Sequence, residues 1–104
     1  MNLSYGLRTR MNSLCREAIR RYGPAPQVGM AIEECAELIV ALRHFDRNRR
    51  EVASVASEIA DVVIMCEQMA LLVGDEAVAS EIVRKLDRLE QRMRPSFDAN
   101  GAPL

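Results

Sequence analysis

The sequence lacks an excess of charge of either sign and any long apolar run. Its 14 basic and 15 acidic side chains give a net charge of −1, so no broad basic field is available to hold nucleic acid. No apolar run reaches the roughly 18 to 20 residues that span a bilayer, and the first residues contain no signal-peptide core. We therefore expect a cytoplasmic protein that binds neither nucleic acid nor a membrane. The basic stretch RHFDRNRR, residues 43–50, is interpreted as a solvated loop.

Cysteine is scarce and shows no redox or zinc-binding spacing. The three cysteines, Cys15, Cys35 and Cys66, form no C-x-x-C motif, and each lies among apolar residues. The sequence predicts that they are reduced and pack as small hydrophobic side chains. A Cys/His nucleophile pair would need the single histidine, His44, and no sequence feature links it to a cysteine.

No period-two alternation typical of strands occurs, whereas apolar residues recur with helical spacing along most of the chain. With 104 residues, 49% of them hydrophobic, the chain fits one small domain, predicted over 1–95 and followed by a flexible C-terminal tail over 96–104. The predicted fold is an all-α four-helix bundle. Its helices are expected over about 2–22, 27–45, 51–73 and 75–94.

Two helix starts are predicted from local signals. Pro24 and Pro26 cannot propagate a helix, so we expect a short connection that ends just before Gln27. Asp75 follows a glycine and is placed to cap the fourth helix.

Three glutamates stand close together in the second predicted helix. Glu33, Glu34 and Glu37 fall within an arc of about 100°, while most of the remaining circumference is apolar, which predicts that protein covers most sides of this helix. The stripe does not continue, since the next position on it is Ala41. Taken alone, the three glutamates also fit an exposed charged face.

The third predicted helix repeats the pattern with Glu58 and Asp61, and five apolar residues follow Asp61, so its surroundings should be largely buried. Buried like charges are costly unless a cation compensates them. Two facing carboxylate pairs offer four oxygen donors, which suits Mg²⁺ or Mn²⁺ better than zinc. A ferritin-like di-iron centre would need Glu-x-x-His motifs, and none occurs.

The segments EECAE, from Glu33, and EIAD, from Glu58, resemble the E-E-x-x-E and E-x-x-D signature of the MazG-like nucleotide pyrophosphohydrolases, the all-α NTP pyrophosphatase superfamily. The resemblance covers about residues 2–94. It implies an enzyme that hydrolyses nucleoside triphosphates, deoxynucleotides included, to the monophosphate and pyrophosphate with the help of Mg²⁺, with Mn²⁺ as a substitute. Such a reaction would remove surplus or non-standard nucleotides from the pool.

The same resemblance implies roles for individual residues. Glu34, Glu37, Glu58 and Asp61 would be the metal ligands. Glu33 would be an auxiliary carboxylate, and both Glu33 and Glu37 are candidates for the general base. With no tryptophan and four other aromatic residues, the chain offers little stacking surface, so no base preference is predicted.

Basic groups on the fourth predicted helix are candidates for substrate phosphates. Lys85, Arg88 and Arg92 share one face, opposite an apolar stripe, and they equally fit an ordinary solvated face. Leu89 stands where family members often carry Asn or Arg, which is a departure from the pattern. His44 lies two turns beyond Glu37, where the end of the helix dipole explains it more simply than substrate contact.

Two further expectations concern function class and assembly. The alternative to an enzyme is a non-enzymatic helical oligomerisation or interaction module with an acidic metal-binding patch. Apolar residues cover most of the second and third predicted helices, and about a hundred residues give little core volume to bury them. We therefore expect a homodimer, or a tetramer built from dimers, as the resemblance also implies.

Overall fold

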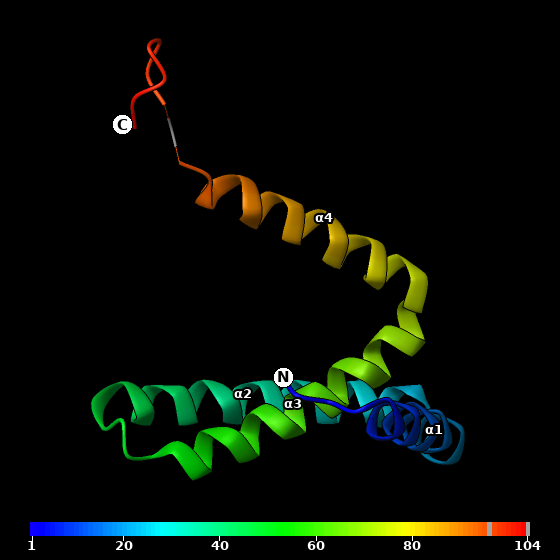
Figure 1. Ribbon diagram of the computed structural model, residues 1–104. Helices are drawn as coiled ribbons and strands as arrows, with labels where there is room; N and C mark the ends of the chain where they lie inside the picture. Colours follow the sequence, from blue (N-terminus) through cyan, green and yellow to red (C-terminus); the bar gives the residue numbers. More distant parts are fainter. Residues whose placement is uncertain (96, 104) are drawn as a thin grey trace. The chain divides into compact units, whose positions relative to one another are not determined.

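In the computed structural model, which describes residues 1–95 and 97–103, the chain forms four helices (Figure 1). They are α1 (Tyr5–Tyr22), α2 (Pro24–Arg47), α3 (Val52–Val73) and α4 (Asp75–Met93). The described residues contain no strand beyond an isolated bridge between Phe97 and Pro103. The predicted all-α class with four helices is therefore confirmed. None of the helices in the described ranges has both the length and the apolar character needed to cross a membrane.

The start of α2 differs from the prediction. The helix begins at Pro24, and Gly23 alone separates it from α1, where its backbone N–H donates to the Ile19 carbonyl. Proline was expected to keep the helix from starting before Gln27, but the N–H groups of a first helical turn have no intrahelical acceptor. Proline therefore costs nothing there, and its fixed φ suits the first turn. Gly23 permits the sharp change of direction because its φ is 84°.

The start of α4 also differs in detail. Gly74, with φ 123°, occupies the capping position, and no side chain caps the helix. Asp75, the predicted cap, is instead the first helical residue. Its carboxylate and that of Glu76 lie in the first turn, where they complement the positive end of the helix dipole. At α1, by contrast, the Ser4 hydroxyl accepts a hydrogen bond of 3.1 Å from the Leu7 N–H.

The chain divides into two compact units, Met1–Val73 and Gly74–Leu104. This division runs through the range 1–95 that the sequence predicts as one domain, and that range stays a prediction. In the first unit, α3 packs against both α1 and α2 (Figure 1). The carboxylates of interest all lie in this unit.

The pairing of α1 with α3 is antiparallel, because residues later in α1 meet residues earlier in α3. The Asn12 amide donates to the Glu67 carboxylate at 2.8 Å, and the Cys15 thiol meets the Ile64 carbonyl at 3.6 Å. Cys15 is almost completely buried, as predicted. Cys35 and Cys66 are exposed, so the prediction that they pack in the interior is wrong for these two.

The interior of the first unit is small, and much apolar surface stays exposed. Its buried apolar residues are Cys15, Ala41, Val55, Met65 and Ala70. Along α2, Ile32 and Ile39 are 66% and 60% exposed. Within the first unit, the cover expected around most of α2 is therefore absent, although α2 contacts both α1 and α3.

The second unit contains α4 and the C-terminal segment. α4 has no buried residue, and its apolar side chains, including Ile82 and Leu86, are exposed. Within 97–103, the Asp98 side chain accepts hydrogen bonds from the N–H groups of Asn100 and Ala102. The predicted tail 96–104 thus includes a local turn, and its residues 96 and 104 lie outside the described ranges.

Candidate metal centre

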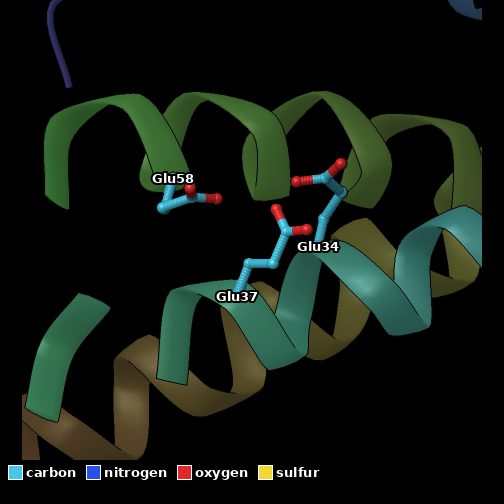
Figure 2. A group of neighbouring side chains, drawn as sticks. All are labelled: Glu34, Glu37 and Glu58. Carbon is cyan, nitrogen blue, oxygen red and sulfur yellow. The ribbon is translucent and has the colours of Figure 1, made fainter. Parts of the chain in front are cut away.

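Three glutamates from two helices converge in the first unit. Glu34 and Glu37 lie one turn apart on α2, and Glu58 faces them from α3 (Figure 2). One carboxylate oxygen from each lies within 4.8 Å of the others. The i, i+3 spacing on α2 aims two carboxylates the same way, and the short turn after Arg47 brings α3 back alongside. The convergence therefore follows from local spacing plus one hairpin.

Two of these carboxylates contain an oxygen that is buried and has no hydrogen-bond partner. Oε2 of Glu34 and Oε2 of Glu58 are both in this state, while the two side chains as a whole are half-buried. Buried polar atoms in folded proteins nearly always have a partner, and an unpaired one is costly. The cluster therefore has free coordinating capacity that a cation would use.

The pKa shifts within the cluster also indicate that a cation would stabilise it. Burial, followed by the negative charges of Glu37 and Asp61, raises the pKa of Glu34. Burial and the same two charges raise the pKa of Glu58. Both shifts mean that the ionised forms are disfavoured when no positive charge is nearby.

Asp61 and Glu33 are placed differently from the three converging glutamates. Asp61 is half-buried on α3, less enclosed than the sequence predicts, and its charge reaches both Glu34 and Glu58. It therefore lies at the edge of the same cluster. Glu33 is exposed and does not belong to the group of three. Its auxiliary or basic role stays a prediction.

A hollow of about 310 Å³ adjoins the carboxylates. Its polar lining residues are Glu37 and His44 from α2 and Ser54 and Glu58 from α3. His44 occupies the last turn of α2, where the predicted dipole interaction is available, and it also faces this hollow. The sequence analysis did not identify Ser54, which lies one turn before Glu58 and lines the hollow.

The predicted phosphate-binding residues are all exposed on α4, in the second unit. Lys85, Arg88 and Arg92 belong to none of the ion pairs found among the described residues. The pairs on α4 join Arg84 to Glu81 and Arg94 to Glu90. The three residues are therefore available to an anionic ligand, and their contact with substrate stays a prediction.

The chemistry of the donor set fits a hard divalent cation. The converging atoms are all carboxylate oxygens, and no histidine or cysteine belongs to the group. Oxygen-only sites suit Mg²⁺ or Mn²⁺, whereas zinc favours nitrogen and sulfur.

In comparisons with protein-family models, curated proteins and solved structures, nothing matches this chain.

Proposed function

We propose that this protein hydrolyses nucleoside triphosphates, deoxynucleotides included, to the monophosphate and pyrophosphate in a Mg²⁺-dependent reaction. The observation that carries the proposal is the convergence of Glu34, Glu37 and Glu58 with two unpartnered buried oxygens. The resemblance of EECAE and EIAD to the MazG-like signature supports the substrate class. Together they favour removal of surplus or non-standard nucleotides as the role.

Glu34, Glu37, Glu58 and Asp61 are the proposed metal ligands, with Mg²⁺ as the cofactor and Mn²⁺ as a substitute. When bound, the metal would offset the charge between the carboxylates and a triphosphate and lower the pKa of bound water. The half-buried positions of Glu34 and Glu58 limit competition from bulk water for their oxygens. The proposed metal would thus bind at the crowded carboxylates, which are costly when no cation compensates their charge.

In the proposed reaction, a water oxygen bonds to the α-phosphorus while the bond from that phosphorus to the α–β bridging oxygen breaks. Pyrophosphate is the leaving group, and the proton of the water passes to a carboxylate. Glu37, inside the cluster, and Glu33, exposed and outside the group of three, are the candidate bases. Lys85, Arg88 and Arg92 would bind the phosphates through charge-assisted hydrogen bonds.

One observation favours the competing proposal of a non-enzymatic interaction module. Large apolar side chains remain exposed on helices outside the cluster, among them Ile32, Ile39 and Ile82. Exposed apolar surface of this kind is typical of protein–protein contacts. An interaction module would bind the cation yet release no pyrophosphate.

The deciding experiment offers purified protein a panel of ribo- and deoxynucleoside triphosphates with Mg²⁺ and measures pyrophosphate and orthophosphate separately. We expect pyrophosphate release that EDTA abolishes. Orthophosphate as the first product would indicate a phosphatase and contradict the proposal. Calorimetric titration with Mn²⁺ alone is run alongside, because binding without turnover of any nucleotide supports the interaction module instead.

A further inference from the structure

The hollow beside the carboxylates extends along the hairpin of α2 and α3 (Figure 1). A short turn after Arg47 joins the two helices, so later residues of α2 and earlier residues of α3 both lie nearer that turn. The polar lining follows this order, from Glu37 and Glu58 at one end to His44 and Ser54 at the other. The hollow therefore begins at the proposed metal ligands and leads toward the turn.

Small side chains leave this space open. Ala41 lies one turn after Glu37 on α2, and Ser54 lies one turn before Glu58 on α3, where longer side chains would fill the gap. The volume of about 310 Å³ is at the lower end of the roughly 300–1,000 Å³ of small-molecule sites. The hollow thus suits one part of a nucleotide rather than a whole one.

Charge indicates which part of a nucleoside triphosphate fits there. The described residues that line the hollow include two carboxylates, Glu37 and Glu58, and neither a lysine nor an arginine. The β- and γ-phosphates carry most of the negative charge of the substrate, and the two carboxylates would repel them. The pentose is uncharged and joins the α-phosphate through the 5′ oxygen, so it meets no such repulsion.

We propose that the hollow holds the pentose of the substrate, and that Ser54 and His44 bind its hydroxyl groups. This inference rests on the proposed function, because an α-phosphate at the metal fixes where the sugar begins. At 1.5 Å per residue, Ser54 lies about 6 Å from Glu58 along the helix axis, and His44 about 10 Å from Glu37. The two side chains therefore stand one and two turns beyond the metal ligands, where the sugar follows the α-phosphate.

The lining at this end matches the chemistry of a sugar. A serine hydroxyl both donates and accepts hydrogen bonds, and an imidazole has a nitrogen on either side of its ring. No side-chain hydrogen bond within the described ranges involves Ser54 or His44, so both are available to a ligand. Ala36, Val40 and Ala41 supply apolar surface for the carbon atoms of the pentose ring.

This arrangement makes the pentose hydroxyls a determinant of substrate choice. A site that hydrogen-bonds a substrate hydroxyl discriminates against an analogue without it, because the polar groups of the site then lose their partner. Ser54 and His44 are exposed, so water replaces the missing hydroxyl and the discrimination should be modest. One neutral hydrogen bond of this kind corresponds to about 3- to 10-fold in affinity.

The first experiment measures the Kd of two kinds of probe by calorimetric titration in Mg²⁺. One is a set of nucleoside triphosphates, one for each base, whose α–β bridging oxygen is replaced by NH so that no pyrophosphate is released. The other is inorganic tripolyphosphate. Ser54→Ala and His44→Ala should each weaken the best-bound nucleotide analogue about 3- to 10-fold and leave tripolyphosphate binding unchanged. Ser57→Ala is the matched control, because Ser57 is also exposed on α3 but does not line the hollow.

Any of three results would overturn the inference. Equal weakening of both probes would mean that Ser54 and His44 act on the phosphates or on the metal site. Unchanged binding of the nucleotide analogue in both variants would leave the two side chains without a role in binding. A natural protein that binds none of the analogues would have no sugar site at all.

The second experiment assigns the contact to the sugar. Analogues that lack the 2′-hydroxyl, or both the 2′- and 3′-hydroxyls, are titrated into the natural protein and into the Ser54→Ala, His44→Ala double variant. The natural protein should bind the dideoxy analogue about 3-fold or more weakly than the ribo analogue, whereas the double variant should bind both alike. Losses that simply add would show that the side chains and the hydroxyls belong to different contacts, and would overturn the inference.

The outcomes also separate this inference from the proposed function. Analogue binding that depends on Ser54 and on the pentose hydroxyls, without pyrophosphate release from any triphosphate, would keep the sugar site and remove the hydrolase. Pyrophosphate release combined with unchanged analogue binding in both single variants would keep the hydrolase and remove the sugar site.

Discussion

The two sides of α2 reverse the usual pattern of a surface helix. The side that packs against α3 contains the half-buried Glu34, while the opposite side contains the exposed Ile32 and Ile39. A helix that needed nothing outside its own chain would place apolar residues inward and carboxylates outward. Both reversals cost stability in the first unit, and each would be relieved by a group from outside that unit.

The chemistry of each side indicates which kind of group would relieve its cost. Crowded carboxylate oxygens without partners would be stabilised by positive charge, and exposed apolar side chains would be stabilised by another apolar surface. Because the glutamates and the exposed isoleucines lie on different sides of one helix, each side can be changed by a substitution that leaves the other intact. The predictions below use that separation.

The largest effect is expected from neutralising the carboxylate side. Glu37→Gln and Asp61→Asn should each lower pyrophosphate release by more than about 100-fold, since even groups that only support metal ligands are worth about 10- to 100-fold. The fold should persist or gain stability, because each change removes a repelling charge. Kinetics with circular dichroism checks both points, and Glu51→Gln serves as the matched control. Activity lost only in proportion to helicity would contradict a metal site.

The sequence predicted the positions of the helices better than the features that depend on single turns or on contacts between helices. Apolar periodicity placed all four helices, because it reports directly on which sides are packed. The two wrong details, at Pro24 and Asp75, concern single turns, where a proline or an aspartate is tolerated at several adjacent positions. Cys35 and Cys66 were misplaced because an apolar neighbourhood in sequence does not say whether a partner element exists in the chain.

The candidate site shows the same limit. Spacing alone indicated that Glu34 and Glu37 share a face, and the structure brings Glu58 to them. Spacing could not show that Glu33 stays outside the group, because Glu33 lies only about 40° from Glu37 around the helix. The position of α3 decides which of the three glutamates converge. Ser54 went unnoticed since serine has no distinctive signal until the α2–α3 pairing is known.

Mg²⁺ should stabilise the protein through the carboxylate side alone. At ten times its Kd, a ligand that binds only the folded state adds about 1.4 kcal/mol, enough to raise Tm by about 5 °C or more in a small domain. We expect that rise in the natural protein and in Ile39→Glu, but not in Glu37→Gln. Scanning calorimetry with and without EDTA measures it. Loss of the rise in Ile39→Glu would show that the two sides are coupled.

The smallest effect is a pH dependence of stability in EDTA. The pKa values of Glu34 and Glu58 are raised in the folded protein, so folding retains their protons and unfolding releases them. As the pH rises from the ordinary glutamate pKa through these raised values, the free energy of unfolding should therefore fall. Glu17 acts in the opposite sense, because its hydrogen bond with Arg20 lowers its pKa, and its contribution is lost only as the pH falls.

Urea unfolding across a pH series separates these contributions. Glu34→Gln combined with Glu58→Gln should remove the decline above the ordinary glutamate pKa, whereas Glu17→Gln should change only the acidic end of the curve. Saturating Mg²⁺ should also remove the decline, since the cation takes the place of the retained protons. A decline that persists in the double variant would mean that its source lies outside the carboxylate cluster. The reversed polarity of α2 would then cost less in the isolated chain than its geometry indicates.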